Sequence, residues 1–348
     1  MTKKTSPGFD LDGPASSDTL YGLPYTVDNA NVVVIPVPWD VTVSYQSGAA
    51  KGPEAIKQAS AQVDLFDEKL PNAWKIGIAM EDIPSQWVKK SKQLRPKAET
   101  YIDAFVSGKG NDTKMKTTLK EINKECTNLV NWVKTTSLKH LNKKKIVALL
   151  GGDHSTPLGL MQAVAEKHDS FGILHIDAHC DLRDAYEGFT YSHASIMFNA
   201  LKIKNMKKLV QVGIRDFSEG ENAIIQDSNE RVKLFSDKSM KENMYHGSSW
   251  FEITKNIVSH LPKHVYISFD IDGLDPKLCP NTGTPVPGGL EFWEAIHLIE
   301  TVVESGRQIV AFDINEVAPG DDEWDANVGA RLLYKIANLA AVSKGIKV

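Results

Sequence analysis

Residues 171–181 read Phe-Gly-Ile-Leu-His-Ile-Asp-Ala-His-Cys-Asp, an apolar run that ends in acidic and imidazole side chains. The run over 171–176 is typical of a buried β-strand. Similar apolar runs lie at 32–37, 74–79, 145–150, 209–214, 264–269 and 308–312. Because these short strands alternate with helical stretches, they predict a mostly parallel sheet covered by helices on both faces. We therefore expect a doubly wound α/β domain.

The rest of the chain divides into an arm, one domain and an insertion. Residues 1–30 are rich in Gly, Pro, Ser, Thr and Asp and predict an N-terminal arm, which leaves 31–348 as a single domain. Residues 86–115 are charged and irregular, which favours an insertion within that domain. The patterns predict helices at 51–62, 116–135, 156–167, 193–200, 241–259, 290–305 and 325–342.

The composition is that of an ordinary globular protein, with 42% hydrophobic and 24% charged residues among 348. A formal net charge of −4 lacks the basic excess of a nucleic-acid binder. No apolar run approaches the roughly 18 residues that span a bilayer. Three cysteines, an odd number, argue against a disulfide scaffold and for a reducing compartment. We expect a cytoplasmic protein with no nucleic-acid or membrane partner.

Three predicted strands lead directly into groups that bind metal ions. The strand over 145–150 is followed by Gly151-Gly152-Asp153-His154-Ser155. The strand over 171–176 is followed by Asp177-Ala178-His179-Cys180-Asp181. The strand over 264–269 is followed by Asp270-Ile271-Asp272-Gly273-Leu274-Asp275-Pro276. Because ligands bind beyond the carboxyl ends of parallel strands, we expect these groups to meet at one edge of the sheet.

The spacing within two of these motifs points ligands to one side of the chain. Asp177, His179 and Asp181 are two residues apart, so an extended backbone directs all three the same way. Asp270 and Asp272 repeat the spacing. With the imidazole of the first motif, six candidate ligands result: His154, Asp177, His179, Asp181, Asp270 and Asp272.

So many acidic groups on one surface repel one another unless a positive charge lies between them. Six ligands are too many for one cation with open positions and suit two ions that share bridging carboxylates. Oxygen donors with some imidazole favour Mn²⁺, while Zn²⁺, Co²⁺, Ni²⁺ and Fe²⁺ stay open. His175, inside the strand, is interpreted as a packed neighbour of the ligands, and Cys180, of opposite parity, as a core residue.

These motifs resemble those of the ureohydrolase superfamily, which includes arginase, agmatinase, guanidinobutyrase and formiminoglutamase. The resemblance runs from about Val32 to Ala341. Besides the three motifs above it includes Ser47-Gly48-Ala49-Ala50-Lys51-Gly52-Pro53-Glu54-Ala55-Ile56, Thr282-Gly283-Thr284-Pro285-Val286-Pro287-Gly288-Gly289-Leu290 and Asp313-Ile314-Asn315-Glu316-Val317-Ala318-Pro319. So many motifs in this order are highly specific.

The resemblance implies a three-layer α/β/α fold of the arginase type, with 31–348 as a catalytic domain. It also implies two Mn²⁺ ions that activate a bridging hydroxide, and assembly into trimers or hexamers. By this likeness one metal ion takes His154, Asp177, Asp181 and Asp270. The other takes Asp177, His179, Asp270 and Asp272.

Three residues are expected to act on a guanidino substrate. A guanidinium is a poor electrophile, so a metal-activated water is needed at neutral pH. Glu316, at a strand end, matches the family's guanidinium-binding glutamate. Asp181 faces the nucleophile and is a candidate to relay its proton to the departing amine. His193 matches the family's proton-shuttling histidine.

The substrate's other end is less defined. Arg183 stands where arginases have an asparagine, and Ser218 where they have an aspartate, although Glu221 is retained. The motifs around them resemble agmatinase-type members, which act on guanidino-alkylamines. Arg183 could instead bind a substrate carboxylate, or pair with Asp184 or Glu187 and contact no substrate. Arginine, guanidinobutyrate, formiminoglutamate and guanidine therefore stay open as substrates.

Two other classes of protein are alternatives. A deacetylase-like amidohydrolase with one metal ion would not need both histidines together with the Asp270 and Asp272 pair. A count of metal ions per chain separates it from a ureohydrolase. A non-catalytic regulator would lack some ligands, and all six are present here.

Overall fold

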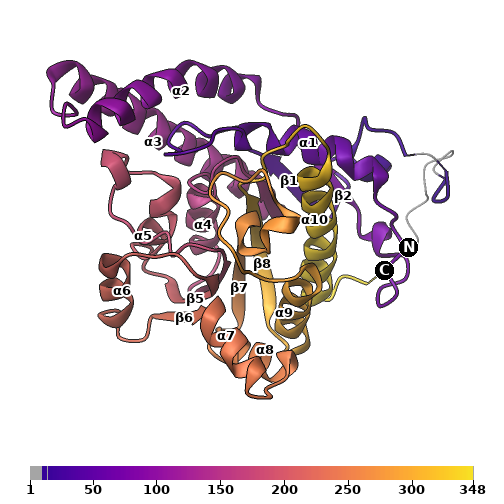
Figure 1. The fold of residues 1–348 in the computed structure, drawn as a ribbon. Coiled ribbons are helices and arrows are strands. Elements are labelled where there is room, and N and C mark those ends of the chain that lie inside the picture. Colours follow the sequence, from indigo (N-terminus) through magenta and orange to yellow (C-terminus); the bar gives the residue numbers. More distant parts are fainter. Residues whose placement is uncertain (1–9, 14, 348) are drawn as a thin grey trace.

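The computed structural model describes residues 10–13 and 15–347. At its centre lies an eight-stranded parallel sheet in the order β2-β1-β3-β8-β7-β4-β5-β6 (Figure 1). The strands are β1 (Val32–Pro36), β2 (Ile78–Met80), β3 (Ile146–Leu150), β4 (Phe171–Ile176), β5 (Met206–Ile214), β6 (Val232–Ser236), β7 (His264–Asp270) and β8 (Gln308–Asn315). The helices are α1 (Gly52–Ala59), α2 (Ser85–Val106), α3 (Thr113–Leu141), α4 (Leu158–Ala165), α5 (Ile196–Ala200), α6 (Glu219–Gln226), α7 (Asp237–Tyr245), α8 (Trp250–Ser259), α9 (Phe292–Glu304) and α10 (Trp324–Ser343).

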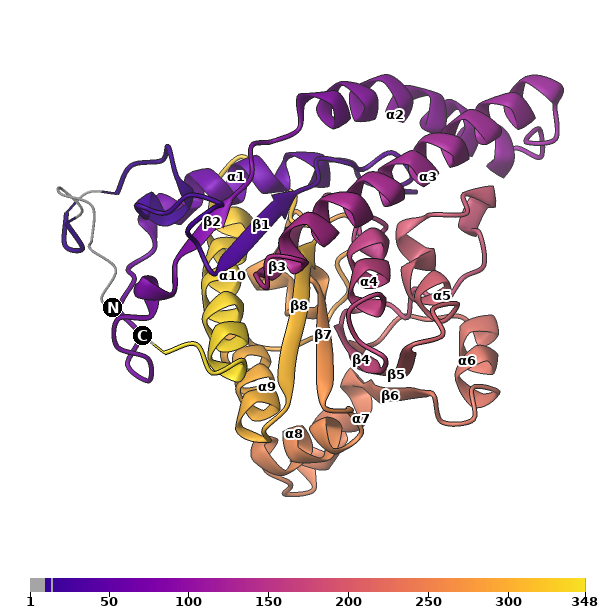
Figure 2. The ribbon, with the colours of Figure 1, turned by 180° about the vertical axis from the view of Figure 1, so that it is seen from behind.

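Helices cover both faces of the sheet, so the expected three-layer α/β/α architecture is confirmed. Alternate residues of β3 show why: Ile146, Ala148 and Leu150 face one apolar core, and Val147 and Leu149 face the other. The first core is completed by α1, α8, α9 and α10. The second is completed by α2, α3, α4 and α5. Figures 1 and 2 show the two groups of helices on opposite sides of the strands.

The strand order brings the motif-bearing strands together. β3, β8, β7 and β4 are adjacent at the centre of the sheet. The chain passes from β3 through α4 to β4, and β7 and β8 fill the space between these two strands. The strand order reverses here, which is where ligands bind in open α/β sheets.

The largest departure from the sequence prediction concerns residues 86–115, which are helical rather than irregular. Most of them belong to α2, and the rest form the turn into α3 and its first residues. The buried side chains of α2 recur every three or four residues: Trp87, Ser91, Leu94, Ala98, Tyr101 and Ile102. Most charges of this segment lie on the opposite, solvated face of a helix that packs on α3, and Arg95 is an exception.

Three smaller differences have local causes. The helix expected over 241–259 is two helices, because Gly247 takes a φ of 99° and Ser249 with Glu252 forms a capping box that starts α8. β6 was not predicted because it is an edge strand with half-exposed residues, among them Lys233. α6 was likewise not predicted, and it too opens with a capping box.

The described part of the N-terminal arm packs on the domain. Leu20, Tyr21 and Leu23 are buried, and the hydroxyl of Tyr21 donates a hydrogen bond of 2.7 Å to the carbonyl oxygen of Ala330 in α10. Residues 1–9 lie outside the described part of the chain. Across 10–13 and 15–347, no helix has the length and apolar character needed to span a membrane.

Candidate active site

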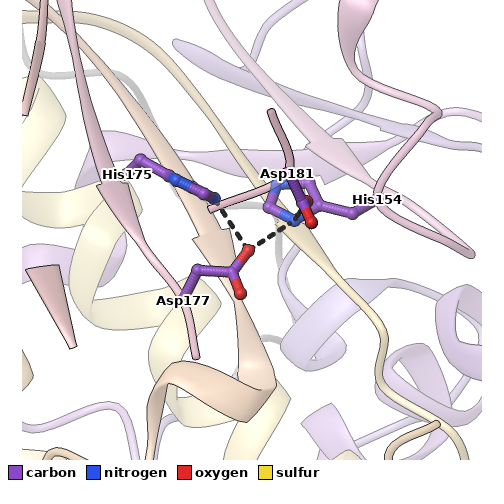
Figure 3. Close-up of side chains that lie close together, drawn as sticks. All are labelled: His154, His175, Asp177 and Asp181. Atoms are coloured by element: carbon purple, nitrogen blue, oxygen red, sulfur yellow. Dashed lines mark hydrogen bonds and ion pairs between the residues drawn. The ribbon is translucent and has the colours of Figure 1, made fainter. Parts of the chain in front are cut away.

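Two groups of metal-competent side chains meet where the central strands end. The first offers one ligand atom per residue within 4.8 Å of one another (Figure 3): His154, His175, Asp177 and Asp181. The second does so within the same distance: Asp177, His179 and Asp272. Because Asp177 belongs to both, the two groups form one continuous cluster.

The carboxylate of Asp177 links the groups through its two oxygens. Its Oδ2 lies 3.0 Å from Nδ1 of His154, and its Oδ1 lies 3.6 Å from Nδ1 of His179. Nδ1 of His179 is also 3.1 Å from Oδ2 of Asp272. Asp177 is fully buried, so a carboxylate in this position suits a bridge between two cations.

The tautomer of His154 leaves a lone pair directed into the cluster. Its Nε2 lies 2.9 Å from the hydroxyl of Ser268, which donates its own proton to Asp313 at 3.0 Å. The hydroxyl therefore accepts from Nε2–H, so in the neutral ring, the form that binds a metal ion, the lone pair is on Nδ1. Without a metal ion, Asp177 and Asp270 raise the pKa of His154 well above its usual range although burial opposes this. This Nδ1 is buried 3.0 Å from Oδ2 of both Asp177 and Asp270, without hydrogen-bond geometry. A lone pair facing two carboxylate oxygens is stabilised by a cation between them.

His175 has a different part in the cluster. The side-chain amide of Gln211 donates to its Nδ1 at 2.9 Å, so the ring proton is on Nε2. That Nε2–H donates to Oδ2 of Asp177 at 2.7 Å. His175 therefore orients a carboxylate and has no lone pair to offer a metal ion, which agrees with its interpretation as a packed neighbour.

The carboxylates of the cluster repel one another in the interior. Burial and the charge of Asp177 raise the pKa of Asp181 well above its usual range. Burial and the charges of Asp272 and Asp177 do the same to the pKa of Asp270. Divalent cations among two imidazoles and four carboxylates would relieve this repulsion. The six residues expected from the sequence are thus brought together, and their donor atoms fit two such ions.

Local turns aim these side chains. Oδ1 of Asp177 accepts the N–H of His179 at 2.6 Å, and Oδ1 of Asp270 accepts the N–H of Asp272 at 2.9 Å. Asp181 has a φ of 55°, so the backbone turns there and does not stay extended. Alternation along an extended chain is therefore only part of the reason why these ligands converge.

A cavity of about 200 Å³ opens beside the cluster. His179 and Asp181 belong both to the cluster and to the cavity wall. The other wall residues are Ser44, Arg183, Tyr186, His193, Ala194, Asp216, Glu221 and Thr284. Of these, His193 and Arg183 were expected from the sequence.

His193 is half-buried in this wall. Its Nε2 lies 3.5 Å from the hydroxyl of Ser44, and its Nδ1 lies 3.3 Å from that of Ser192. The ring meets that of Tyr186 edge-on, with 6.2 Å between centroids. Burial and the charge of His179 lower the pKa of His193 to about 4, so the imidazole is neutral near pH 7.

Glu316 lies beside the cluster, directly after β8. Its Oε1 accepts the N–H of His154 at 2.8 Å, and its own N–H donates to the carbonyl oxygen of Gly152 at 2.8 Å. Burial and the charge of Asp270 raise its pKa well above the usual range. Within the described residues, Glu316 does not form part of the cavity wall, so its guanidinium-binding role stays a prediction.

Arg183 has partners other than the expected Asp184 or Glu187. Its guanidinium stacks on the ring of Tyr186 at 4.7 Å, and its Nε lies 3.6 Å from Oε2 of Glu221. The side chain is 42% exposed at the cavity mouth. The Arg183 guanidinium is therefore held by Tyr186 and Glu221, and the Glu221 carboxylate partly balances its positive charge.

Two wall residues were missed by the sequence analysis. Asp216 lies two residues beyond β5, so the same strand-end argument that found the ligands could have found it. Its N–H donates to the carbonyl oxygen of Ala178 at 3.1 Å, which fixes it beside the ligand motif. Ser44 lies in an irregular segment after β1, and no pattern in the sequence marks it.

Comparison with known proteins agrees with the geometry. The model of the Arginase family matches residues 30–338. An N(1)-aminopropylagmatine ureohydrolase of Thermus thermophilus is 32% identical over 321 residues, covering 91% of this chain and 93% of that protein. An agmatinase of Pyrococcus horikoshii is 28% identical over 330 residues, covering 91% and 95%.

A solved structure shares the fold. The agmatine ureohydrolase of Thermoplasma volcanium superposes with a TM-score of 0.69 at 22% identity, covering 93% of this chain and 94% of that one. The family model matches most of this chain, and one relative exceeds 30% identity over most of both chains. These two findings establish the family. The chain belongs to the arginase family and is a hydrolase of amidino C–N bonds.

Proposed function

We propose that this protein hydrolyses agmatine, or an agmatine extended by a further amine, to urea and an amine, with two Mn²⁺ ions bound by the six-residue cluster. The observation that carries the proposal is a free carboxylate, Asp216, in the wall of the cavity that opens beside the cluster. Relatives named agmatinase and N(1)-aminopropylagmatine ureohydrolase support this substrate class.

Asp216 is the wall carboxylate left for a substrate ammonium. Asp181 belongs to the cluster, and Glu221 accepts hydrogen bonds from the N–H of Leu182 and from Ser218. Among the described residues Asp216 forms no ion pair, and it is exposed. Its neighbour Arg215 is already engaged by the carbonyl oxygens of Gly213, Asp272, Leu274 and Val286.

Three residues of the chain have separate roles in the reaction that we propose. Two divalent cations held by the cluster would lower the pKa of a water molecule and so supply a nucleophile at neutral pH. Asp181, which faces both cluster and cavity, takes the proton that this water loses. The neutral imidazole of His193 accepts a proton and passes one to the departing amine nitrogen, so the ring begins and ends the step uncharged. Glu316 holds the guanidinium with its carboxylate.

The charge of the cavity mouth favours an amine over an acid. The guanidinium of Arg183 is stacked and lies within reach of Glu221, so it is not a free partner for a carboxylate. The carboxylate of an acidic substrate such as 4-guanidinobutyrate would also lie near Asp216, and the two negative charges would repel each other. Arginine, formiminoglutamate and guanidine are the remaining alternative substrates.

Urea release by the Mn²⁺-loaded protein tests the proposal. The substrates are agmatine, N(1)-aminopropylagmatine, arginine, 4-guanidinobutyrate and guanidine, with formamide release from formiminoglutamate assayed alongside. We expect turnover of the amines, lost in Asp272→Asn, and about two metal ions per chain. Release from none of them, or a preference for the acids, would contradict the proposal.

A variant of the wall tests the substrate's distal end. Asp216→Asn should raise the KM for agmatine about threefold to fivefold, because one ion pair at an exposed site is worth at most about 1 kcal/mol. The KM for butylguanidine, which has no second amine, should change less than twofold. Asp184→Asn, an exposed carboxylate nearby, is the matched control. Equal effects of Asp216→Asn on both substrates would refute the assignment.

The assembly and location of the protein are also proposals. We infer a cytoplasmic homo-oligomer, a trimer or a hexamer, because of the likeness to the family. Light scattering of the purified protein should give three or six times the 38.4 kDa chain mass, and a monomeric mass would contradict it. Fractionation of the source cells tests the location.

A further inference from the structure

The imidazole of His193 is held by a chain segment outside the central sheet. This segment, residues 38–50, follows β1. It brings the hydroxyl of Ser44 to 3.5 Å from Nε2 of His193, and a hydrogen bond to the Thr42 backbone partly offsets the lowering of the His193 pKa. The Thr42 hydroxyl donates at 3.2 Å to the carbonyl oxygen of Tyr191, two residues before His193. The 38–50 segment therefore contacts both the ring and the backbone that carries it.

Helix α2 binds the 38–50 segment through the guanidinium of Arg95. Nη1 of Arg95 donates to the carbonyl oxygen of Val41 at 3.2 Å and to that of Val43. These two carbonyls flank Thr42. Nε of Arg95 donates to Glu99, one turn further along α2, at 3.1 Å, and the Arg95 side chain is only 12% exposed. The Arg95 guanidinium is thus fixed by Glu99 through Nε and bonded to the 38–50 segment through Nη1.

A second contact lies one turn earlier on the same face of α2. The hydroxyl of Ser91 donates to Oδ1 of Asp40 at 3.3 Å. Oδ2 of Asp40 accepts the N–H of Gly48 at 2.9 Å and that of Ala50 at 3.3 Å. Asp40 thus joins the two ends of the 38–50 segment, and α2 is bonded to that junction.

Hydrogen bonds matter in the second half of the segment, where packing is incomplete. A cavity of about 750 Å³ lies between the 38–50 segment, α1 and α2, and its wall includes Asp40, Ser91 and Arg95. Tyr45, beside Ser44, is 71% exposed. Trp39 and Val41 are packed in the core, whereas residues 44–47 are half-buried or exposed. The Arg95 and Asp40 bonds therefore restrain the part of the segment that carries Ser44, which packing alone does not fix.

We propose that Arg95 is a positioning residue for His193: by holding the carbonyls of Val41 and Val43, it fixes the 38–50 segment and, through Thr42 and Ser44, the imidazole. The inference rests on the proton-transfer role proposed above for His193. A displacement of about 1 Å in such a group costs up to a hundredfold in rate. Arg95 does not touch the substrate cavity, so its loss should act on kcat and not on KM.

The test compares Arg95→Met with Lys92→Met, which removes an exposed cation from the same helix. With agmatine, Arg95→Met should lower kcat about tenfold and change KM less than threefold, while Lys92→Met stays within twofold. Arg95→Lys should recover part of the loss. In a His193→Ala background, Arg95→Met should cost less than a further twofold, because the group that it positions is gone. A tenfold loss in that background as well would overturn the proposal.

Two further measurements keep the proposal open to refutation. If Arg95→Met does not fold, Ser91→Ala should lower kcat about threefold by the same route, and no change in it would count against the proposal. If the wild-type protein hydrolyses no guanidino substrate, the proposed function fails, and NMR then tests the positioning alone. The ring-proton shifts of His193, identified by their loss in His193→Ala, should move in Arg95→Met and not in Lys92→Met. Unmoved shifts would refute the inference.

Discussion

Binding of divalent cations should raise the melting temperature of this protein by an amount that the cluster determines. A ligand at one hundred times its dissociation constant stabilises the folded state by about 2.7 kcal/mol. For 348 residues the entropy of unfolding is about 0.7 kcal/mol/K, so each site contributes about 4 °C and two sites about 7 °C. The assay is thermal unfolding after treatment with EDTA, repeated across a titration of Mn²⁺.

The variant Asp272→Asn separates metal binding from general stabilisation. Oδ2 of Asp272 lies 3.1 Å from Nδ1 of His179, and its charge helps to raise the pKa of Asp270. Without metal the variant should melt within a few degrees of the wild type, because it loses both the repulsion between Asp272 and Asp270 and the attraction between Asp272 and His179. With Mn²⁺ its shift should fall to half or less, while Asp184→Asn keeps the full shift. Equal shifts in Asp272→Asn and the wild type would refute the assignment of the ligands.

Two further predictions concern catalysis and pH. His193→Ala should lower kcat for agmatine about a hundredfold with little change in KM, measured by urea release, because the positioned imidazole that relays a proton is lost. A matching change in KM would assign His193 to binding instead. Burial opposes the charge of Asp67, but contact with Lys335 at 2.6 Å lowers its pKa. Asp67→Asn should therefore cost about 1 kcal/mol in urea unfolding at pH 7, a difference that closes as the pH falls below about 4. A constant difference at all pH values would contradict this.

Much of the site was predictable because it depends on where strands end. The apolar runs located the central strands, and the residues just beyond them include the six proposed ligands. What the pattern did not reveal is how the ligands are oriented. The turn at Asp181, the proton on Nε2 of His175 and the lone pair of His154 all depend on partners far away in the sequence, such as Gln211 and Ser268.

The fold was less predictable in α2, where many charged residues obscure the helical spacing of the buried ones. The charged residues of α2 suggested an irregular insertion, although Leu94 and Ala98 lie on one buried face. That error also concealed a contact with consequences for the site. Arg95 reaches Val41 over 54 positions of sequence, a pairing that local patterns do not contain.

The choice of substrate follows from which charges remain after internal contacts are counted. The Glu221 carboxylate accepts hydrogen bonds from the N–H groups of Leu182 and Ser218, and it also lies near Arg183. Arg183 is thereby partly neutralised at the cavity mouth. Asp216 has no ion-pair partner in the described part of the chain. Because an unpaired carboxylate attracts a cation and repels an acid, the wall of this cavity suits a guanidino compound that ends in an ammonium group.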